Sequence, residues 1–273
     1  MSGLDAGEVS RSLSERANDQ LDELETFASI DSTNTYLLNQ PAPDPGHFRV
    51  AIADEQTSGR GRHSRRWISP PGSGLYLSIA YTFGGRLDQM PALTLALGVG
   101  VVDALARLDI GGVSLKWPND IVARDGKLGG ILTEVLAATE HRVTVVAGVG
   151  INIDLPDGLS LDGESGWVQR PVDLRSIAAG VPGRTRLAAA IIDALFETLT
   201  RFGMLGFSVF AEDWRRRDWL LGREVIAAMP GGNITGTAAG VDADGALIVD
   251  APAGPMRVVS GSIELPAEEG LSR

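Results

Sequence analysis

The spacing of apolar and polar residues divides the chain near residue 220 into two regions of different character. In the first region, short apolar runs bounded by glycine, proline and polar turns are typical of β-strands. They predict strands at 49–53, 75–82, 113–116, 120–123, 128–135 and 142–153. Longer apolar segments with helical spacing predict helices at 90–108, 186–202 and 207–220. A further helix is expected to begin at Ser32 or Thr33, where small polar side chains can cap the first turn.

The second region, after Leu221, contains only short strand candidates separated by turns. These candidates are 224–228, 236–241, 246–250 and 257–260. The dipeptide Asp244-Gly245 between two of them is a strong hairpin-turn signal. The pattern predicts a small β-barrel at 221–266 behind a larger domain at 25–220. A mobile N-terminal lead, or a short helix, is expected at 1–24 and a tail at 267–273.

The composition is that of a folded protein and removes several classes of chemistry. Hydrophobic residues make up 44% of the chain, which is enough for a sizeable core. There is no cysteine, which excludes disulfides, cysteine nucleophiles and thiolate metal sites and fits a reducing compartment. The net charge of −11 disfavours general binding to nucleic acid, so no nucleic-acid partner is expected.

No segment is expected to target the chain for export or to anchor it in a membrane. Residues 1–24 are polar and acidic, unlike the apolar core of a signal peptide. The apolar run 92–102 is too short to span a bilayer. We therefore expect a cytoplasmic protein with no membrane partner.

The first segment with evident chemistry is a glycine-punctuated basic loop at 57–67, called the arginine loop below. Within seven residues it carries four arginines, namely Arg60, Arg62, Arg65 and Arg66. Guanidinium groups suit phosphate oxygens, and Gly59 and Gly61 let the backbone approach a ligand. The loop matches neither G-x-x-x-x-G-K-[ST] nor G-x-G-x-x-G. A solvated basic surface loop is the alternative interpretation.

Two lysines and a carboxylate form a second candidate site. Lys116 and Lys127 are the only lysines among 24 basic residues, all the others being arginine. This indicates a need for a compact ammonium, with chance survival in a lysine-poor chain as the alternative. Asp120 follows Lys116 across a Trp-Pro-Asn turn and could act as a base, bind Mg²⁺ or only cap the turn. The pair Gly129-Gly130 permits close approach of a ligand to the strand after Lys127.

A third segment places Asn152 at the end of the apolar, glycine-containing run 148–153. A buried amide needs a polar partner, and an adenine edge and a core hydrogen bond are equally good candidates. The three histidines, His47, His63 and His141, have no metal-ligand spacing. No Ser-His-Asp framework is recognisable either.

Taken together, these segments resemble the biotin protein ligases, also called biotin–[acetyl-CoA-carboxylase] ligases. The resemblance covers roughly residues 30–266 and preserves the family's order and spacing of motifs. The motifs are Asp31-Ser32-Thr33-Asn34, Gln56-Thr57-Ser58-Gly59-Arg60-Gly61-Arg62 with Trp67, Lys116-Trp117-Pro118-Asn119-Asp120, Lys127-Leu128-Gly129-Gly130-Ile131 and 148–152. Each motif alone is weak to moderate, but the combination is highly specific.

The resemblance implies an α+β fold with a mixed-sheet, class II synthetase-like catalytic domain and a small C-terminal SH3-like β-barrel. It also implies two half-reactions. Biotin and ATP would first form biotinyl-5′-AMP and pyrophosphate, and a lysine of a biotin carboxyl carrier domain of an acyl-CoA carboxylase would then displace AMP. No enzyme nucleophile is required, so the lack of cysteine is no obstacle.

The resemblance further implies roles for particular residues. The expected catalytic residues are Lys127, Arg60, Asp120 and Lys116. The expected biotin site comprises Ser32, Thr33, Asn34, Gln56, Gly59, Arg60, Gly61, Arg62, Trp67, Lys127, Gly129 and Gly130. The expected ATP and adenylate site comprises Arg62, Arg65, Trp67, Lys116, Asn119 and Asn152. Biotin is a substrate, and Mg²⁺ is the expected cofactor with ATP, held in part by Asp120.

The chain departs from the family in two ways. The family's loop usually reads G-R-G-R-x-G, and His63-Ser64 stand in place of its last two positions, which leaves the flexibility of the loop open. The DNA-binding domain of repressor-type members has no counterpart, so repression of a biotin operon is not expected.

Two other functions stay open from the sequence, and so does the oligomeric state. A lipoate ligase shares the catalytic architecture but uses a different acid. A biotin-responsive regulator would bind biotin without labelling any acceptor. Both a monomer and a homodimer occur in the family.

Overall fold

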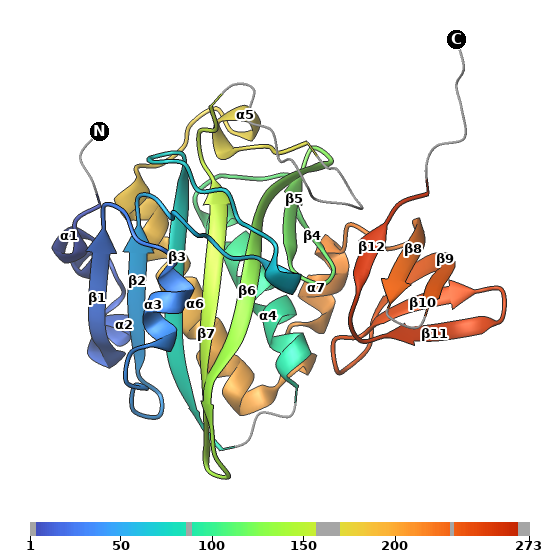
Figure 1. The fold of residues 1–273 in the computed structure, drawn as a ribbon, viewed down its shortest axis with the longest axis horizontal. Coiled ribbons are helices and arrows are strands. Elements are labelled where there is room, and N and C mark those ends of the chain that lie inside the picture. The colour runs from blue at the N-terminus through green and yellow to red at the C-terminus, as the bar shows by residue number, and fades with distance from the viewer. Residues whose placement is uncertain (1–3, 86–88, 157–169, 230–231, 267–273) are drawn as a thin grey trace.

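A computed structural model describes residues 4–85, 89–156, 170–229 and 232–266. Its main domain is built on a seven-stranded mixed sheet (Figure 1). The strands, in chain order, are β1 (Leu21–Phe27), β2 (Phe48–Ala53), β3 (Gly74–Gly84), β4 (Val113–Lys116), β5 (Asp120–Ala123), β6 (Gly126–Ala138) and β7 (Arg142–Asn152). Their order in the sheet is β1-β2-β3-β7-β6-β5-β4, with β1 and β2 parallel and the other pairs antiparallel. All six strands predicted in this region are confirmed within a few residues, and β1 is an addition.

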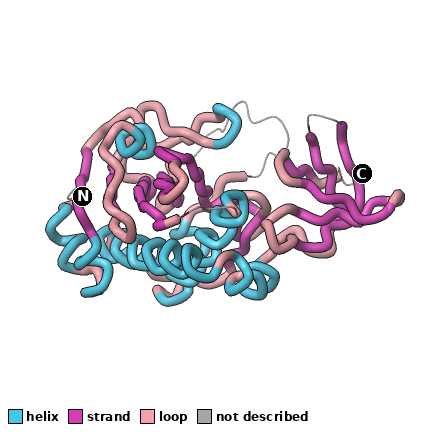
Figure 2. The backbone as a smooth tube through the Cα atoms, turned by 90° about the horizontal axis from the view of Figure 1, so that it is seen from below, coloured by secondary structure: helices cyan, strands magenta, loops and turns pink. Residues whose placement is uncertain are grey.

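Helices cover one face of this sheet, as Figure 2 shows. The two long ones are α4 (Met90–Arg107) and α6 (Arg184–Leu205), which pack on each other, and the helices predicted there are confirmed. On the opposite face lies the short helix α3 (Thr33–Leu38), capped by the Ser32 side chain as predicted. Alternate residues of the central strands supply these two faces: Ile79 belongs to the main core, whereas Ala80 packs with Leu37 of α3.

Helix α4 is an apolar core helix. Among the described residues it is the one helix long and apolar enough to pass for a membrane span, but 67% of it is buried inside the domain. Its buried side chains belong to the same hydrophobic core as α6 and the sheet. Burial on all sides explains why its apolar residues do not form a single stripe.

Residues 4–20 pack on the main domain, so of the two expectations for 1–24, a mobile lead or a short helix, the structure agrees with the helical one. They form α1 (Ala6–Arg11) and α2 (Glu15–Gln20) and continue into β1. Val9 and Ala17 are fully buried, and Ser14 donates its hydroxyl to Asp193 of α6 at 2.8 Å. These apolar residues are too sparse in the sequence to indicate packing. The expected boundary at residue 24 falls inside β1.

The helix predicted at 207–220 is too long. The structure has a short 3₁₀ turn at Phe207–Val209, followed by α7 (Ala211–Arg217). The chain leaves the helix at Asp218 because the next backbone N–H, of Trp219, donates to the carbonyl of Leu115 in β4 at 2.8 Å. A long-range backbone pairing therefore ends the helix. A further short helix, α5 (Leu174–Ile177), was not predicted.

The C-terminal region is a five-stranded antiparallel sheet with the order β11-β10-β9-β8-β12. Its strands are β8 (Glu224–Met229), β9 (Gly232–Val241), β10 (Leu247–Ala251), β11 (Gly254–Val258) and β12 (Ser262–Glu264). The first four were predicted, although β9 starts four residues before the predicted 236 and β11 starts three residues before the predicted 257. The strand β12 was not predicted. The predicted tail at 267–273 lies outside the described residues.

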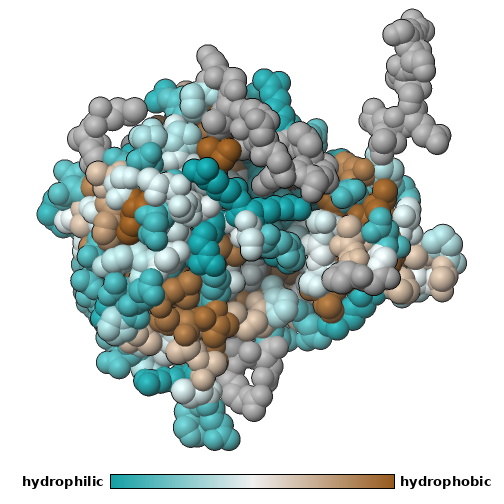
Figure 3. All heavy atoms as spheres, in the orientation of Figure 1, coloured by the Kyte–Doolittle hydropathy of each residue, from teal (hydrophilic) through white to brown (hydrophobic). Residues whose placement is uncertain are grey.

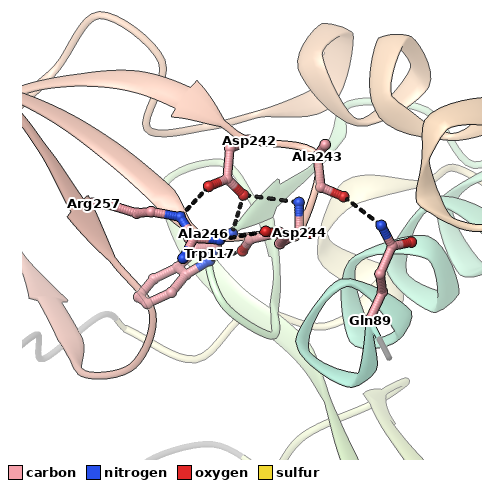
Figure 4. Close-up of polar contacts among 8 residues, drawn as sticks. Gln89, Trp117, Asp242, Ala243, Asp244, Ala246 and Arg257 are labelled. Atoms are coloured by element: carbon pink, nitrogen blue, oxygen red, sulfur yellow. Dashed lines mark hydrogen bonds and ion pairs between the residues drawn. The ribbon is translucent and has the colours of Figure 1, made fainter. Parts of the chain in front are cut away.

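A turn of the C-terminal sheet is seated on the main domain, as Figure 4 shows. The buried indole of Trp117 donates to the carbonyl of Gly245 at 2.9 Å, and Gln89 donates to the carbonyl of Ala243 at 3.3 Å. A Cβ on Gly245 would lie 2.7 Å from the Cα of Ala92 in α4, so only glycine allows this approach. The two regions are therefore joined directly beside Lys116.

The seated turn is held in shape by its own residues. The Asp242 carboxylate accepts the backbone N–H groups of Asp244 and Ala246, each at 2.9 Å. Arg257 of β11 forms ion pairs with Asp242 and, at 2.7 Å, with Asp244. The Asp-Gly turn predicted from the sequence thus also serves as a contact between the C-terminal sheet and the main domain.

Candidate functional site

A cavity lies between the open face of the main sheet, the arginine loop and β12. Figure 3 shows hydrophilic side chains gathered over the upper parts of β7 and β6, where the arginine loop crosses the sheet in Figure 1. The cavity is lined by Ser32, Thr33, Asn34, Gln56, Arg60, Gly61, Arg62, His63, Arg65, Arg66, Trp67, Leu77, Lys116, Trp117, Pro118, Asn119, Asp120, Lys127, Gly130, Ile131, Leu132, Gly148, Val149, Gly150, Gly261, Ser262 and Ile263. The structure therefore brings together most of the site residues predicted from separate segments.

Two glycines of β7 make the floor of the cavity. Gly148 pairs with Leu132 of β6, and Gly150 pairs with Gly130. A Cβ on Gly148 would lie 2.2 Å from Oδ1 of Asn34, and one on Gly150 would lie 2.6 Å from the Trp67 ring. Because these two positions of β7 are glycines, the Asn34 amide and the Trp67 indole can lie directly against the sheet.

Polar groups of α3 and the preceding loop form one wall. Gln56 accepts the backbone N–H and the hydroxyl of Thr33 at 2.9 and 3.1 Å, and its amide donates to Ser69 at 3.2 Å. The fully buried Ser78 lies 2.7 Å from the Thr33 hydroxyl and 2.6 Å from Oδ1 of Asn34. Hydroxyl and amide groups held in this way suit a compact polar ligand such as a urea or amide.

The arginine loop is a hairpin rather than an open coil. Its two limbs are joined by hydrogen bonds from Gly61 N–H to the Arg65 carbonyl at 2.7 Å and from Trp67 N–H to the Gly59 carbonyl at 2.9 Å. At the tip, His63 and Ser64 both adopt the left-handed region, with φ of 54° and 61°. These are the two positions that depart from the family pattern. A non-glycine residue there strains the tip without breaking the hairpin.

Charged groups of the loop face both the cavity and the sheet. Arg60 pairs with Glu134 of β6 at 2.7 Å, and Arg66 donates to the carbonyl of Thr57 at 3.0 Å. Burial lowers the pKa of Arg62, which the Asp120 carboxylate partly counteracts. A guanidinium that is partly removed from water in this way interacts more strongly with an anionic ligand.

The two lysines and the aspartate form a compact charged cluster. Lys127 pairs with Asp120 at 3.0 Å and lies 5.6 Å from the centre of the Trp67 ring. Lys116 is 4% exposed, and burial lowers its pKa to about 7, although Asp120 acts in the opposite direction. Within the described residues, no three acidic or histidine side chains gather as a metal site. A cation here would need phosphate oxygens as further ligands beside Asp120.

Three predicted site residues lie outside the cavity lining. Asn152 donates its amide to the carbonyls of Lys127 at 3.2 Å and Val172 at 3.0 Å. These are hydrogen bonds of the core kind, which was one of the two expected partners of this amide beside an adenine edge. Gly59 closes the hairpin, where a Cβ would lie 2.4 Å from the Trp67 carbonyl oxygen. Gly129 allows close packing, with a Cβ position 2.5 Å from the Gly150 carbonyl oxygen.

Several residues that support or line the cavity were not predicted from the sequence. Ser78 and Glu134 support Asn34 from β3 and β6, and nothing in their local sequence marks them. Residues 261–263 complete the cavity from the C-terminal sheet, where β12 was not predicted. The period-2 spacing of Gly148 and Gly150 is the one signal that could have revealed an open strand face.

Comparison with known proteins agrees with this architecture. Residues 26–152 match a family model described as the Biotin/lipoate A/B protein ligase family, and residues 220–265 match the Biotin protein ligase C terminal domain. The Biotin--[acetyl-CoA-carboxylase] ligase of Mycobacterium tuberculosis is 32% identical over 88% of each chain. The Bifunctional ligase/repressor BirA of Escherichia coli is 34% identical over 81% of this chain and 67% of its own length.

The fold is shared with solved structures. The biotin protein ligase from Aquifex aeolicus in complex with biotin and ATP superimposes with a TM-score of 0.75 and 27% identity, covering 90% of this chain and 100% of that chain. The relatives span both the main domain and the C-terminal sheet. The chain therefore belongs to the biotin protein ligase family.

Proposed function

We propose that this protein is an ATP-dependent biotin protein ligase. A biotin carboxylate oxygen bonds to the α-phosphorus of ATP as the bond to pyrophosphate breaks, giving biotinyl-5′-AMP. The neutral ε-amine of a lysine in a biotin carboxyl carrier domain then attacks the acyl carbon, AMP leaves with the electron pair of the C–O bond, and the nitrogen releases one proton as the amide forms. The observation that carries this proposal is one cavity that joins a hydroxyl–amide wall to a lysine, arginine and tryptophan cluster.

The wall formed by Ser32, Thr33 and Gln56 is suited to the ureido head of biotin. A urea offers one acceptor and two donors, and the wall presents hydroxyl and amide groups of both kinds. The hydrogen bonds among these groups fix them before the ligand arrives. Asn34 and Trp67, which rest on Gly148 and Gly150, would lie against the ring system.

Lys127 is suited to the reacting end of biotin. Its ammonium lies beside Asp120 at 3.0 Å and near Trp67, so its position is set before the substrates bind. Negative charge grows on the oxygens of the α-phosphate and acyl group during both transfers, and a fixed cation stabilises it. Arg62 and Trp67 from the arginine loop would close over the adenylate and exclude water from the mixed anhydride.

Further features of the proposal rest on the family. Mg²⁺ accompanies ATP and would be bound by phosphate oxygens together with Asp120, with Lys116 and Asn119 on the same side. The C-terminal sheet is proposed to be the family's SH3-like barrel and the main domain a class II synthetase-like fold. The absence of cysteine fits a cytoplasmic, reducing location.

The direct test of the function is pyrophosphate release that requires both ATP and biotin. A carrier domain added afterwards should become labelled on one lysine, with release of AMP. Folded protein that releases no pyrophosphate would rule out the ligase. Competition between biotin and lipoate in the same assay distinguishes the two acids. Tight biotin binding without labelling of any acceptor would favour a regulator.

The Lys127→Ala variant tests the role of the ammonium. We expect adenylate formation to fall by roughly two to three orders of magnitude, because a preorganised charge on the developing anion is lost. The fold should persist, since the side chain is part of a partly exposed ion pair. Single-turnover pyrophosphate release and thermal unfolding measure the two effects. Near-normal turnover would remove Lys127 from this role.

A further inference from the structure

Glu134 holds two residues that line the cavity, Asn34 and Arg60, although it does not line the cavity itself. One carboxylate oxygen accepts from Arg60 of the arginine loop at 2.7 Å, and the other accepts from the amide of Asn34 at 2.9 Å. The side chain is 22% exposed, whereas that of Arg60 is 43% exposed. A single carboxylate on β6 therefore joins the arginine loop to the floor of the site.

The inner half of this connection is rigid. Asn34 is 3% exposed, and its amide also donates to the carbonyl of Leu132 at 3.3 Å. Its Oδ1 lies 2.6 Å from the hydroxyl of the fully buried Ser78 and fills the space left by Gly148. Because each group has a fixed partner, the Glu134 carboxylate has a defined position whether or not the loop is closed.

The outer half is movable. Arg60 lies on the first limb of the hairpin, opposite Arg66, and its guanidinium reaches β6 from an exposed position. A charge pair of this kind is worth little energy and weakens in salt, so it can break and reform during a catalytic cycle. The Glu134 carboxylate is thus a fixed acceptor, and the Arg60 guanidinium can bind to it or leave it.

We propose that Glu134 is a positioning residue that latches the arginine loop closed through Arg60 and so retains the adenylate in the cavity. This inference rests on the proposed function, because retention matters only if an adenylate forms. Glu134 touches no reacting atom. Its contribution is the fraction of time during which the loop covers the intermediate.

Limited digestion with trypsin tests the latch without any ligand, since the loop itself carries four arginines. In Glu134→Gln, the initial rate of cleavage at residues 60–66, identified by fragment mass, should rise roughly three- to tenfold at low salt. Salt at about 0.5 M should raise loop cleavage in the native protein, relative to cleavage elsewhere in the chain, but not in the variant. A merely structural role for Glu134 would not produce this salt dependence.

Controls assign the effect to the pair. Glu23→Gln breaks a similar ion pair, with Arg49 at 3.2 Å, and should leave loop cleavage unchanged. Arg60→Gln should expose the remaining loop arginines to the same extent as Glu134→Gln, and combining the two should add nothing further. If Glu134→Gln fails to fold by circular dichroism, Arg60→Gln still makes the measurement with the Glu134–Asn34 contact intact. Equal cleavage rates in native and folded variant protein would overturn the latch.

Retention of the intermediate is measured separately. Biotinyl-AMP formed in one turnover should escape from Glu134→Gln several-fold faster on rapid gel filtration, while its rate of formation stays within about twofold. If the native protein releases no pyrophosphate, the proposed function fails, yet the digestion result still decides whether the latch exists. Faster digestion with unchanged adenylate escape would overturn the retention role.

Discussion

At the residue scale, the most unusual group is Lys116, an ammonium placed where water is excluded. It is 4% exposed, and burial lowers its pKa from the ordinary value of 10.5 to about 7. The nearby Asp120 favours the charged form, while Lys127 disfavours it. A lysine of this kind gives up its proton easily, and an incoming phosphate would restore the charge.

This burial predicts a pH dependence of stability. Below about pH 7 both the folded and the unfolded chain hold the proton, and the cost of burying the ammonium is fully present. Between about 7 and 10.5 the unfolded chain binds more protons, so stability increases with pH by at most about 1.4 kcal/mol per pH unit. Urea unfolding of native protein and Lys116→Met from about pH 7.5 to about pH 9.5 checks this. Parallel curves for the two proteins would contradict it.

At the scale of single elements, β7 decides the shape of the site because its glycines leave one face bare. In Gly150→Ala the new methyl would lie 2.6 Å from the Trp67 ring, so the ring must leave the sheet. We expect biotin affinity to fall by roughly tenfold, because the indole no longer covers the ligand. Titration calorimetry measures the affinity, and thermal unfolding measures the fold.

The matched control is Gly111→Ala, where no atom lies within 4 Å of the added methyl. It should bind biotin as the native protein does. If Gly150→Ala also bound biotin normally, biotin binding would not depend on the position of the Trp67 ring against β7.

At the scale of the whole molecule, the turn at Asp242–Gly245 is one contact that places the C-terminal sheet beside the cavity. Trp117→Phe removes the indole donor and leaves the Gly245 carbonyl without its 2.9 Å hydrogen bond. We expect amide exchange at 242–246 to accelerate roughly tenfold, corresponding to about 1.4 kcal/mol. Exchange monitored by mass spectrometry checks this.

The comparison variant is Trp219→Phe, which loses a hydrogen bond to Asp125 at 3.1 Å that does not involve the seated turn. Exchange at 242–246 should stay at the native rate in that variant. Because residues 261–263 line the cavity, loosening the turn should also weaken the binding of ATP. Unchanged exchange in Trp117→Phe would show that other contacts hold the two sheets together.

The accuracy of prediction from sequence depended on how local each signal was. The strands at 113–116 and 120–123 are found where predicted, because apolar runs and turn residues encode them locally. The end of α7 was missed because a backbone bond between Trp219 and Leu115, distant in sequence, sets it. Likewise, β12 is three residues long and depends on pairing with β8.

The sequence alone determined the long helices and the central strands, the division near residue 220, the arginine loop, the two lysines and the resemblance to the family. Each of these features is encoded locally, by the structural propensity of a short segment, by the spacing of its apolar residues or by a motif. Only the tertiary structure decided the packing of residues 4–20 on α6, the hydrogen bonds from Asn152 to two distant carbonyls, and the connection from Ser78 through Asn34 and Glu134 to Arg60. Those contacts join strands and loops far apart in sequence, and such neighbours exist only after the chain has folded.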